Sequence, residues 1–218
     1  MAIWIDIGYD IEHPLYRDVD ISFQKGEIIN IIGDNGSGKS TFYRTLSGTI
    51  PPLRGQIPAE IIGACAVISD DVAPPKESRV SDIYDLLGGV SIVESRCPEI
   101  GRKLHPCIYQ TLETLSSGQR RMLEIASALV AGKKILIFDE AFGNLDFSNR
   151  EMCIHLVRGL KDVTIFNTSH NLEDVVELGG KIIFLDARRS EFVAYTGART
   201  VECIRRFMAS RILLPDPH

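Results

Sequence analysis

The glycine-rich segment at residues 33–40, called the phosphate loop below, has the residue types and spacing needed to hold phosphate groups. It reads Gly-Asp-Asn-Gly-Ser-Gly-Lys-Ser, matches the pattern G-x-x-x-x-G-K-[ST], and follows the apolar run at residues 28–32. Its glycines let successive backbone N–H groups point inward around phosphates, and a following helix adds its positive N-terminal end. Lys39 would supply charge to the β- and γ-phosphates, and Ser40 a hydroxyl to Mg²⁺. The alternative is a glycine-rich turn that only caps a helix.

Two consecutive carboxylates follow a second apolar run further along the chain. Residues 135–138 read Ile-Leu-Ile-Phe and lead directly into Asp139 and Glu140. A buried strand there would bring Asp139 to the carboxyl edge of a sheet, beside the phosphate loop, where it could bind Mg²⁺ directly or through water. Glu140 follows where a base could accept a proton from an attacking water molecule. Such a pair is usually only a polar turn, but the phosphate loop makes metal binding the better interpretation.

These segments lie in a chain whose short β-branched runs alternate with helical stretches. This alternation is typical of an α/β domain with a largely parallel sheet. Several runs are apolar throughout, as expected of strands covered on both faces. We expect strands at residues 2–7, 19–23, 27–32, 65–69, 134–138, 163–167, 181–185 and 192–195. We expect helices at residues 39–47, 80–87, 117–131, 148–160, 172–178 and 198–210.

The strand signal is absent between Asp70 and Leu115, where helical segments and segments broken by proline and glycine replace it. We interpret residues 70–132 as a helical insert. The insert interrupts an α/β core formed by about residues 1–69 and 133–218. The whole chain of 218 residues is then one domain.

The composition is that of a soluble globular protein. Hydrophobic residues make up 44% and charged residues 24%, which excludes disorder and long coiled coils. The 24 Lys and Arg against 29 Asp and Glu give a formal charge of −5, so there is no electrostatic reason to expect a nucleic acid partner. The five cysteines are odd in number and widely spaced, which indicates reduced thiols and not a disulfide framework or a zinc site.

The sequence shows neither a secretory signal nor a membrane-spanning segment. The N-terminus lacks a basic region followed by an apolar stretch. The best apolar run, residues 61–69, is about half of the ~18 residues that a spanning helix needs and is predicted to be a buried strand. If this protein works at a membrane, another chain is expected to span it.

Residues 115–119, called the signature segment below, read Leu-Ser-Ser-Gly-Gln and resemble the L-S-G-G-Q signature of the ATP-binding cassette (ABC) family. They depart from it only at Ser117. Taken alone, Ser-Ser-Gly-Gln is an ordinary helix N-cap. The order and spacing relative to Lys39 and Asp139 make that alternative a poor one.

Three more positions resemble the same family. Asp146, at the end of residues 144–146, is similar to the D-loop aspartate, and His170 is similar to the switch histidine; alone, His170 would more often be a helix cap or a surface residue. Tyr9, thirty residues before the phosphate-loop lysine, is similar to the aromatic residue that stacks on adenine. Tyr16 is the second candidate for that role, and core packing is the alternative for either tyrosine.

The resemblance implies a P-loop NTPase (RecA-like) core with a mostly parallel sheet, an α-helical insert, and an antiparallel β region trimmed at residues 51–58. It implies a Mg²⁺-dependent ATPase in which two copies face each other head to tail and enclose two ATP molecules, with Asp146 coupling the two sites. The implied catalytic residues are Lys39, Glu140 and His170, and the implied metal-binding residues are Ser40 and Asp139. The implied ATP-binding residues are Tyr9, Gly33, Asp34, Asn35, Gly36, Ser37, Gly38, Lys39, Ser40 and Thr41. The residues that bind the partner's ATP are Leu115, Ser116, Ser117, Gly118 and Gln119.

The resemblance also implies partners and a location. A single short cassette of this family energises separate integral membrane subunits, so it is peripheral on the cytoplasmic face of the membrane and docks through the helical insert. The Asp-Glu-Ala run favours export over import. Where the family has a glutamine before the insert, this chain has Ser69 or Asp70; Asp lacks a donor and Ser lacks reach. The alternatives are a soluble mechanical ATPase of the same superfamily, or a small-molecule kinase, which would leave the signature segment and His170 unexplained.

Overall fold

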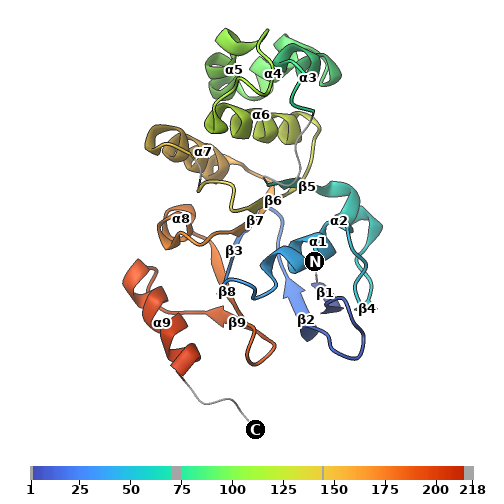
Figure 1. Cartoon of the computed structure of the whole chain (residues 1–218), viewed down its shortest axis with the longest axis vertical. Helices are drawn as coiled ribbons and strands as arrows, with labels where there is room; N and C mark the ends of the chain where they lie inside the picture. The colour runs from blue at the N-terminus through green and yellow to red at the C-terminus, as the bar shows by residue number, and fades with distance from the viewer. Residues whose placement is uncertain (1, 70–74, 144, 214–218) are drawn as a thin grey trace.

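A computed structural model describes residues 2–69, 75–143 and 145–213 and shows an α/β fold (Figure 1). Its larger sheet has the strand order β5-β6-β7-β3-β8-β9. Strands β5 to β8 and β3 pair in parallel, and only β9 pairs antiparallel, with β8. The mostly parallel sheet predicted from the sequence is therefore confirmed. The bounds are β3 (Ile28–Ile32), β5 (Cys65–Ile68), β6 (Ile135–Asp139), β7 (Thr164–Thr168), β8 (Lys181–Asp186) and β9 (Glu191–Tyr195).

A small antiparallel sheet packs against β9 of the larger one. In it β1 (Ala2–Ile7) pairs with β2 (Tyr16–Ser22) and with the two-residue strand β4 (Arg54–Gly55). Ile3, Ile5 and Ile7 are buried at every second position, so one face of the strand packs on the core. β4 is short, as expected from the compressed stretch at residues 51–58.

Helices cover the larger sheet and form a separate group at one end of the molecule. Figure 1 shows α3 to α6 together at that end, in the region that the sequence predicted to be helical. Their buried side chains, among them Tyr84, Ile100 and Leu123, share one apolar cluster with Phe138 of β6. The bounds are α1 (Lys39–Leu46), α2 (Ala59–Ala64), α3 (Val80–Leu86), α4 (Val90–Arg96), α5 (Pro98–Leu104), α6 (Ser117–Val130), α7 (Phe147–Gly159), α8 (Leu172–Leu178) and α9 (Val201–Leu213), with a 3₁₀ turn at His105–Cys107.

Three predicted elements need correction. The strand predicted at residues 19–23 is β2, which begins three residues earlier, at Tyr16. The apolar run at residues 61–69 is not one buried strand: α2 continues to Ala64 and β5 begins at Cys65. A short apolar run has no periodicity that separates strand from buried helix. The C-terminal helix begins three residues later than predicted, because the Thr200 hydroxyl accepts the N–H of Cys203 at 3.2 Å and caps it there.

Two buried asparagines join the central strands of the larger sheet. Asn30 of β3 and Asn167 of β7 lie opposite each other in parallel register, and both are fully buried. The Asn167 amide donates to Asn30 Oδ1 at 2.9 Å, and the Asn30 amide donates to the carbonyl of Gly179 at 2.6 Å. β3 leads into the phosphate loop and β7 leads to His170, so this pair links the two strands that carry predicted site residues.

Along the described ranges, every helix is too short or too polar to cross a bilayer. All five cysteines are thiols outside any disulfide, and four of them are buried. Burial raises the pKa of Cys65 and of Cys153 to about 11. These two thiols are therefore neutral near pH 7.

Candidate functional site

The phosphate loop joins the end of β3 to the start of α1. Gly36 and Gly38 have φ angles of 78° and 90°, in the left-handed region that favours glycine. Lys39 is buried, and its ammonium donates to the carbonyl oxygens of Gly33 and Asp34, each at 2.9 Å. Both acceptors are neutral, so a charged phosphate oxygen would be a stronger acceptor for this ammonium group.

The inside of the loop has room for a ligand but not for an added side chain at its base. A Cβ at Gly33 would lie 2.6 Å from Ser37 Oγ and 2.9 Å from the carbonyl oxygen of Leu185. Ser37 Oγ is itself buried and has no hydrogen-bond partner among the described residues. A buried hydroxyl without a partner costs free energy unless a ligand or water satisfies it. The loop therefore fits the phosphate groups that its sequence predicts.

Tyr16, the first residue of β2, is hydrogen-bonded to the phosphate loop. Its hydroxyl donates to the carbonyl oxygen of Ser37. The C=O and N–H of one trans peptide point in opposite directions, so this bond turns the N–H of Gly38 away from Tyr16. Tyr16 is buried against Phe192, with ring centroids 4.8 Å apart. It cannot stack on adenine, and core packing, the alternative considered for this residue, is what the structure shows.

Tyr9 lies beside the loop with its ring open to solvent. Its side chain is largely exposed, and its hydroxyl accepts a hydrogen bond from Thr41 Oγ1 at 3.3 Å. Thr41 is in the first turn of α1. The exposed aromatic face thus lies near the end of the phosphate loop, and its contact with adenine stays a prediction.

Carboxylates from the end of β6 face the loop lysine. Burial lowers the pKa of Lys39, while Glu140, Asp139 and Asp34 oppose that effect. Asp139 accepts a hydrogen bond from Thr168 Oγ1 at the end of the neighbouring strand β7. The carboxylates keep the lysine charge favourable in a buried position.

Tyr43 is a site residue that the sequence analysis missed. Its pKa is raised, first by burial and then by the carboxylate of Asp139, to which its side chain hydrogen-bonds. Tyr43 lies four residues after Lys39 in the same helix, and residues at this spacing share one face. Helical spacing from the lysine was the signal that could have found it.

Glu140 and His170, thirty residues apart, are in direct contact. His170 Nε2 lies 2.5 Å from Glu140 Oε1, and each side chain is about half exposed, at 47% and 49%. Glu140 has a φ of 53°, unusual for a residue with a side chain, and its N–H donates to the carbonyl of Thr168 at 2.8 Å. The edge of the sheet thus fixes the backbone of Glu140 while its carboxylate stays accessible to water.

Ser40 and Asp139 are the candidate metal ligands. Ser40 is exposed in the first turn of α1, and Asp139 is the last residue of β6. Within the described part of the chain, no group of three or more His, Cys, Asp and Glu could hold a metal. Mg²⁺ usually keeps several waters and takes one or two protein ligands beside phosphate oxygens. The two residues therefore fit a metal that arrives with a nucleotide.

The signature segment begins helix α6. Ser116 is the N-cap: its hydroxyl accepts the N–H of Gln119 at 3.2 Å, and Gln119 Oε1 accepts the N–H of Ser116 at 2.9 Å. Ser116 and Ser117 are exposed, whereas Leu115 and Gly118 are buried. This is the capping box typical of a helix start. Figure 1 shows α6 in the helical group and α1 beside the small sheet, so the segment and the phosphate loop lie in different parts of one copy.

The predicted D-loop aspartate caps the next helix, α7. Asp146 Oδ1 accepts the N–H of Asn149 at 3.0 Å, a bond that lowers the pKa of the carboxyl. A Cβ added at Gly118 would lie 2.9 Å from the Asn149 amide nitrogen, so α6 and α7 begin side by side. Asn144, at the start of the predicted D-loop, lies outside the described residues.

The predicted replacement for the family's glutamine is only partly described. Ser69 is buried one residue after β5, and its hydroxyl has no hydrogen-bond partner among the described residues. Asp70, the other candidate, lies outside the described residues. The buried hydroxyl of Ser69 has no exposed surface with which to contact a partner.

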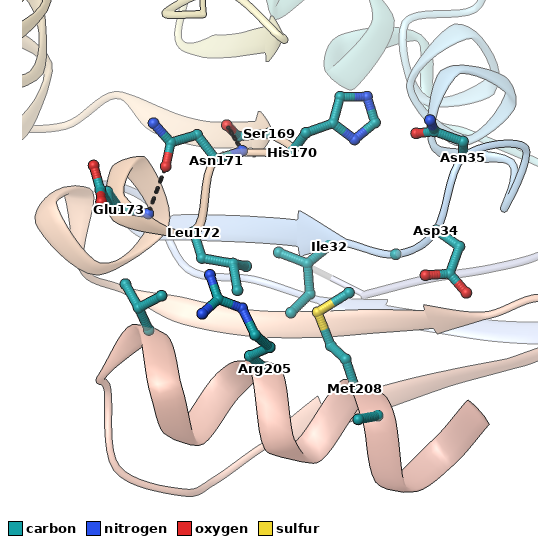
Figure 2. A pocket seen from close by; sticks show the side chains of 13 residues that line it. Ile32, Asp34, Asn35, Ser169, His170, Asn171, Leu172, Glu173, Arg205 and Met208 are labelled. Carbon is teal, nitrogen blue, oxygen red and sulfur yellow. Dashed lines mark hydrogen bonds between the residues drawn. The ribbon is translucent and has the colours of Figure 1, made fainter. Parts of the chain in front are cut away.

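A cavity of about 550 Å³ lies between the phosphate loop, residues 169–173 and helix α9. In Figure 2, Asp34, Asn35 and His170 lie along one side of it, and Arg205 and Met208 of α9 lie along the other. The sequence analysis did not place α9 at the site. The cavity leaves His170 and the loop open to a ligand or to another protein.

A family model described as ABC transporter matches residues 16–143. The chain belongs to the ABC transporter family. The family predicted from the signature segment is thus confirmed.

Several ABC proteins are similar to this chain. The lacticin-481/lactococcin-DR transport/processing ATP-binding protein of Lactococcus lactis is 28% identical over 211 residues, which cover 85% of this chain and 29% of the relative. The thiamine import ATP-binding protein of Vibrio parahaemolyticus is 26% identical over 228 residues, 93% of this chain and 94% of the relative. The chain thus spans less than a third of the first relative and nearly all of the second.

A solved nucleotide-free ATP-binding cassette from an ABC transporter has a TM-score of 0.78 to this chain. It is 20% identical, and the match covers 99% of this chain and 100% of that one. At this identity the likeness establishes the fold alone.

Proposed function

We propose that this ABC chain binds and hydrolyses ATP and thereby energises transport through separate membrane subunits. The observation that carries the proposal is the convergence at one sheet edge of a buried loop lysine, Asp139 and the Glu140–His170 pair. In this proposal the chain is a single ABC domain, residues 1–218, with its helical insert at about residues 70–132.

The proposed chemistry divides among the residues of the site. Lys39 and the inward N–H groups of the loop hold the β- and γ-phosphates. Glu140 accepts a proton from the attacking water, and His170, at 2.5 Å, orients its carboxylate and contacts the γ-phosphate. Bound Mg²⁺, held by Ser40 and Asp139, would neutralise phosphate charge.

A second copy would complete each nucleotide site. Ser116 and Ser117 are exposed at the N-terminus of a 14-residue helix, where backbone N–H groups and the helix dipole favour an anion. They lie apart from the phosphate loop of their own chain (Figure 1). In the proposal two copies pack head to tail, and the signature segment of one closes on the γ-phosphate of the other, with Asp146 coupling the sites.

An apolar groove supports the proposal that this chain binds a membrane subunit. The groove lies between β5, α3 and α6, has a volume of about 360 Å³, and is lined mostly by apolar side chains such as Ile83, Leu87 and Leu123. Such a surface fits a short helix of a membrane subunit, which would hold this chain on the cytoplasmic face of the membrane. Export remains the proposed direction from the Asp-Glu-Ala run, although the thiamine relative is an import protein by name.

The proposal is tested with Glu140→Gln and the exposed control Glu60→Gln. Glu140→Gln should bind ATP, lose about 100-fold or more in phosphate release without an acceptor, and form an ATP-dependent dimer in light scattering. Glu60→Gln should behave as wild type. A Glu140→Gln protein that stays monomeric in saturating Mg-ATP with normal turnover would contradict the proposal, and a strict need for a phosphoryl acceptor would indicate a kinase.

Partner and direction need a separate experiment. The Glu140→Gln dimer, trapped with ATP in native membranes, should copurify with an integral membrane protein whose fold indicates import or export. Copurification of soluble protein alone would favour a mechanical ATPase.

A further inference from the structure

An ion pair between partly buried Arg150 and fully buried Asp174 joins helices α7 and α8 beside the site. Arg150 Nε donates to Asp174 Oδ1 at 2.6 Å, and Arg150 Nη1 lies 3.1 Å from Glu177 Oε2. The Arg150 side chain is 14% exposed and that of Asp174 only 1%. An ion pair with a fully buried member contributes little net stability compared with apolar packing, because the buried charge loses its hydration and the other loses most of it. Stability alone therefore does not explain these charges.

The second carboxylate oxygen of Asp174 is hydrogen-bonded to the segment that carries His170. Asp174 Oδ2 accepts a hydrogen bond from Ser169 Oγ at 2.8 Å, and Ser169 Oγ accepts the N–H of Asn171 at 3.0 Å. His170 lies between these two residues, so the backbone on both of its sides is fixed. Its imidazole then reaches Glu140 at 2.5 Å.

Arg150, at the other end of this series of contacts, is also hydrogen-bonded to the predicted D-loop. The N–H of Arg150 donates to the carbonyl oxygen of Asp146 at 2.8 Å, in the first turn of the helix that Asp146 caps. A displacement of the Asp146 turn would therefore move the guanidinium group, and with it the carboxylate of Asp174.

We propose that Arg150 and Asp174 are positioning residues, which hold His170 against Glu140 through Ser169 and link it to the Asp146 turn. The inference rests on the proposed ATPase function and adds residues that do not touch the nucleotide. Without the guanidinium group, the carboxylate of Asp174 is left buried and unpaired, and the 169–171 segment shifts to relieve it. A displacement of about 1 Å at a catalytic group can lower the rate by about 100-fold.

The chain offers a matched control for this ion pair. Arg211 of α9 donates to buried Asp186 at 3.0 Å and to Glu191 at 2.6 Å, and it is 19% exposed. Arg150→Met and Arg211→Met thus remove the same group from the same kind of carboxylate pair. Both should lower the melting temperature. Only Arg150→Met should lower kcat, by about 10- to 100-fold, while its affinity for ADP stays within about threefold of wild type.

A double-mutant cycle with His170→Ala separates positioning from general destabilisation. If Arg150 acts through His170, Arg150→Met should lower kcat no further once His170 is alanine. Ser169→Ala, which removes one hydroxyl, should likewise lower kcat no further once His170 is alanine. It takes the place of Arg150→Met in the cycle if that variant does not fold. If the losses in kcat multiply in the double variant, this inference alone is overturned. It is also overturned if Arg150→Met and Ser169→Ala both keep full kcat while His170→Ala has a reduced kcat. Full turnover in His170→Ala overturns the proposed role of His170 itself.

Discussion

Tyr16 offers the sharpest test of how the phosphate loop is built. Tyr16→Phe removes one hydroxyl that donates to the carbonyl of Ser37, and it leaves the ring in contact with Phe192. Ser37 is 2% exposed and Tyr16 is 1% exposed, so water cannot replace the lost donor. The variant tests whether this bond directs the N–H of Gly38 into the loop.

The expected cost follows from leaving that carbonyl without its partner. An unsatisfied buried acceptor costs about 1–3 kcal/mol. For a chain of this length, each kcal/mol lowers the melting temperature by about 2–4 °C. The midpoint of thermal unfolding should therefore fall by roughly 2–12 °C. ADP affinity should fall about tenfold if the Gly38 N–H leaves its inward direction.

Tyr195→Phe is the matched control. The Tyr195 hydroxyl also donates to a backbone carbonyl, that of Ala198, at 2.7 Å, but in an exposed position. Water can replace it, so we expect a change within about 0.5 kcal/mol and unchanged ADP affinity. Calorimetric melting and ADP titration of both variants decide the matter. Equal melting temperatures and equal ADP affinities in Tyr16→Phe and wild type would refute the reasoning.

Two further predictions concern the signature helix and a buried thiol. Ser116→Ala should lower the free energy of unfolding by about 1 kcal/mol, because α6 loses the acceptor for the Gln119 N–H. Ser116→Asp keeps that acceptor and should keep the stability but lose ATP-dependent dimerisation; a dimer as stable as wild type would contradict the anion-binding role of this helix start. Burial raises the pKa of Cys153 from 9.0 to about 11, so its stabilisation is complete below pH 9 and is lost as pH rises toward 11. Urea unfolding between pH 8 and 10.5 should show a smaller loss in Cys153→Ala, and an identical slope in both proteins would contradict the shift.

The sequence predicted those parts of the site that depend on local spacing. The loop lysine, Asp139 at the end of its strand and the Ser116 cap each follow from a few adjacent residues. Helix α8 was predicted with its observed bounds. The signature segment gave the family, which the family model confirms. These features could be found because turn geometry and helix caps are encoded within about ten residues.

The parts that were missed depend on which distant segments meet. The bond from Tyr16 to the phosphate loop, the bond from Thr168 to Asp139, and the Arg150–Asp174 pair each join residues on different elements. A tyrosine at the start of a strand, or an arginine in a helix, has the same local signature whether it is buried at a site or exposed. Tertiary packing alone decides which of these side chains is buried at the site: β2 packs against the phosphate loop, and α7 packs on α8.

The Asn30–Asn167 pair in the middle of the sheet has a consequence for the distance between Lys39 and His170. Moving β7 by one residue along β3 would displace His170 by about 3.3 Å and turn the Asn167 amide to the opposite face. An amide left alone in an apolar layer is unfavourable, so alternative alignments of these strands are penalised. The position of the His170 imidazole relative to Lys39, measured along the strands, is therefore set by the asparagine pair in the sheet interior, before any nucleotide binds.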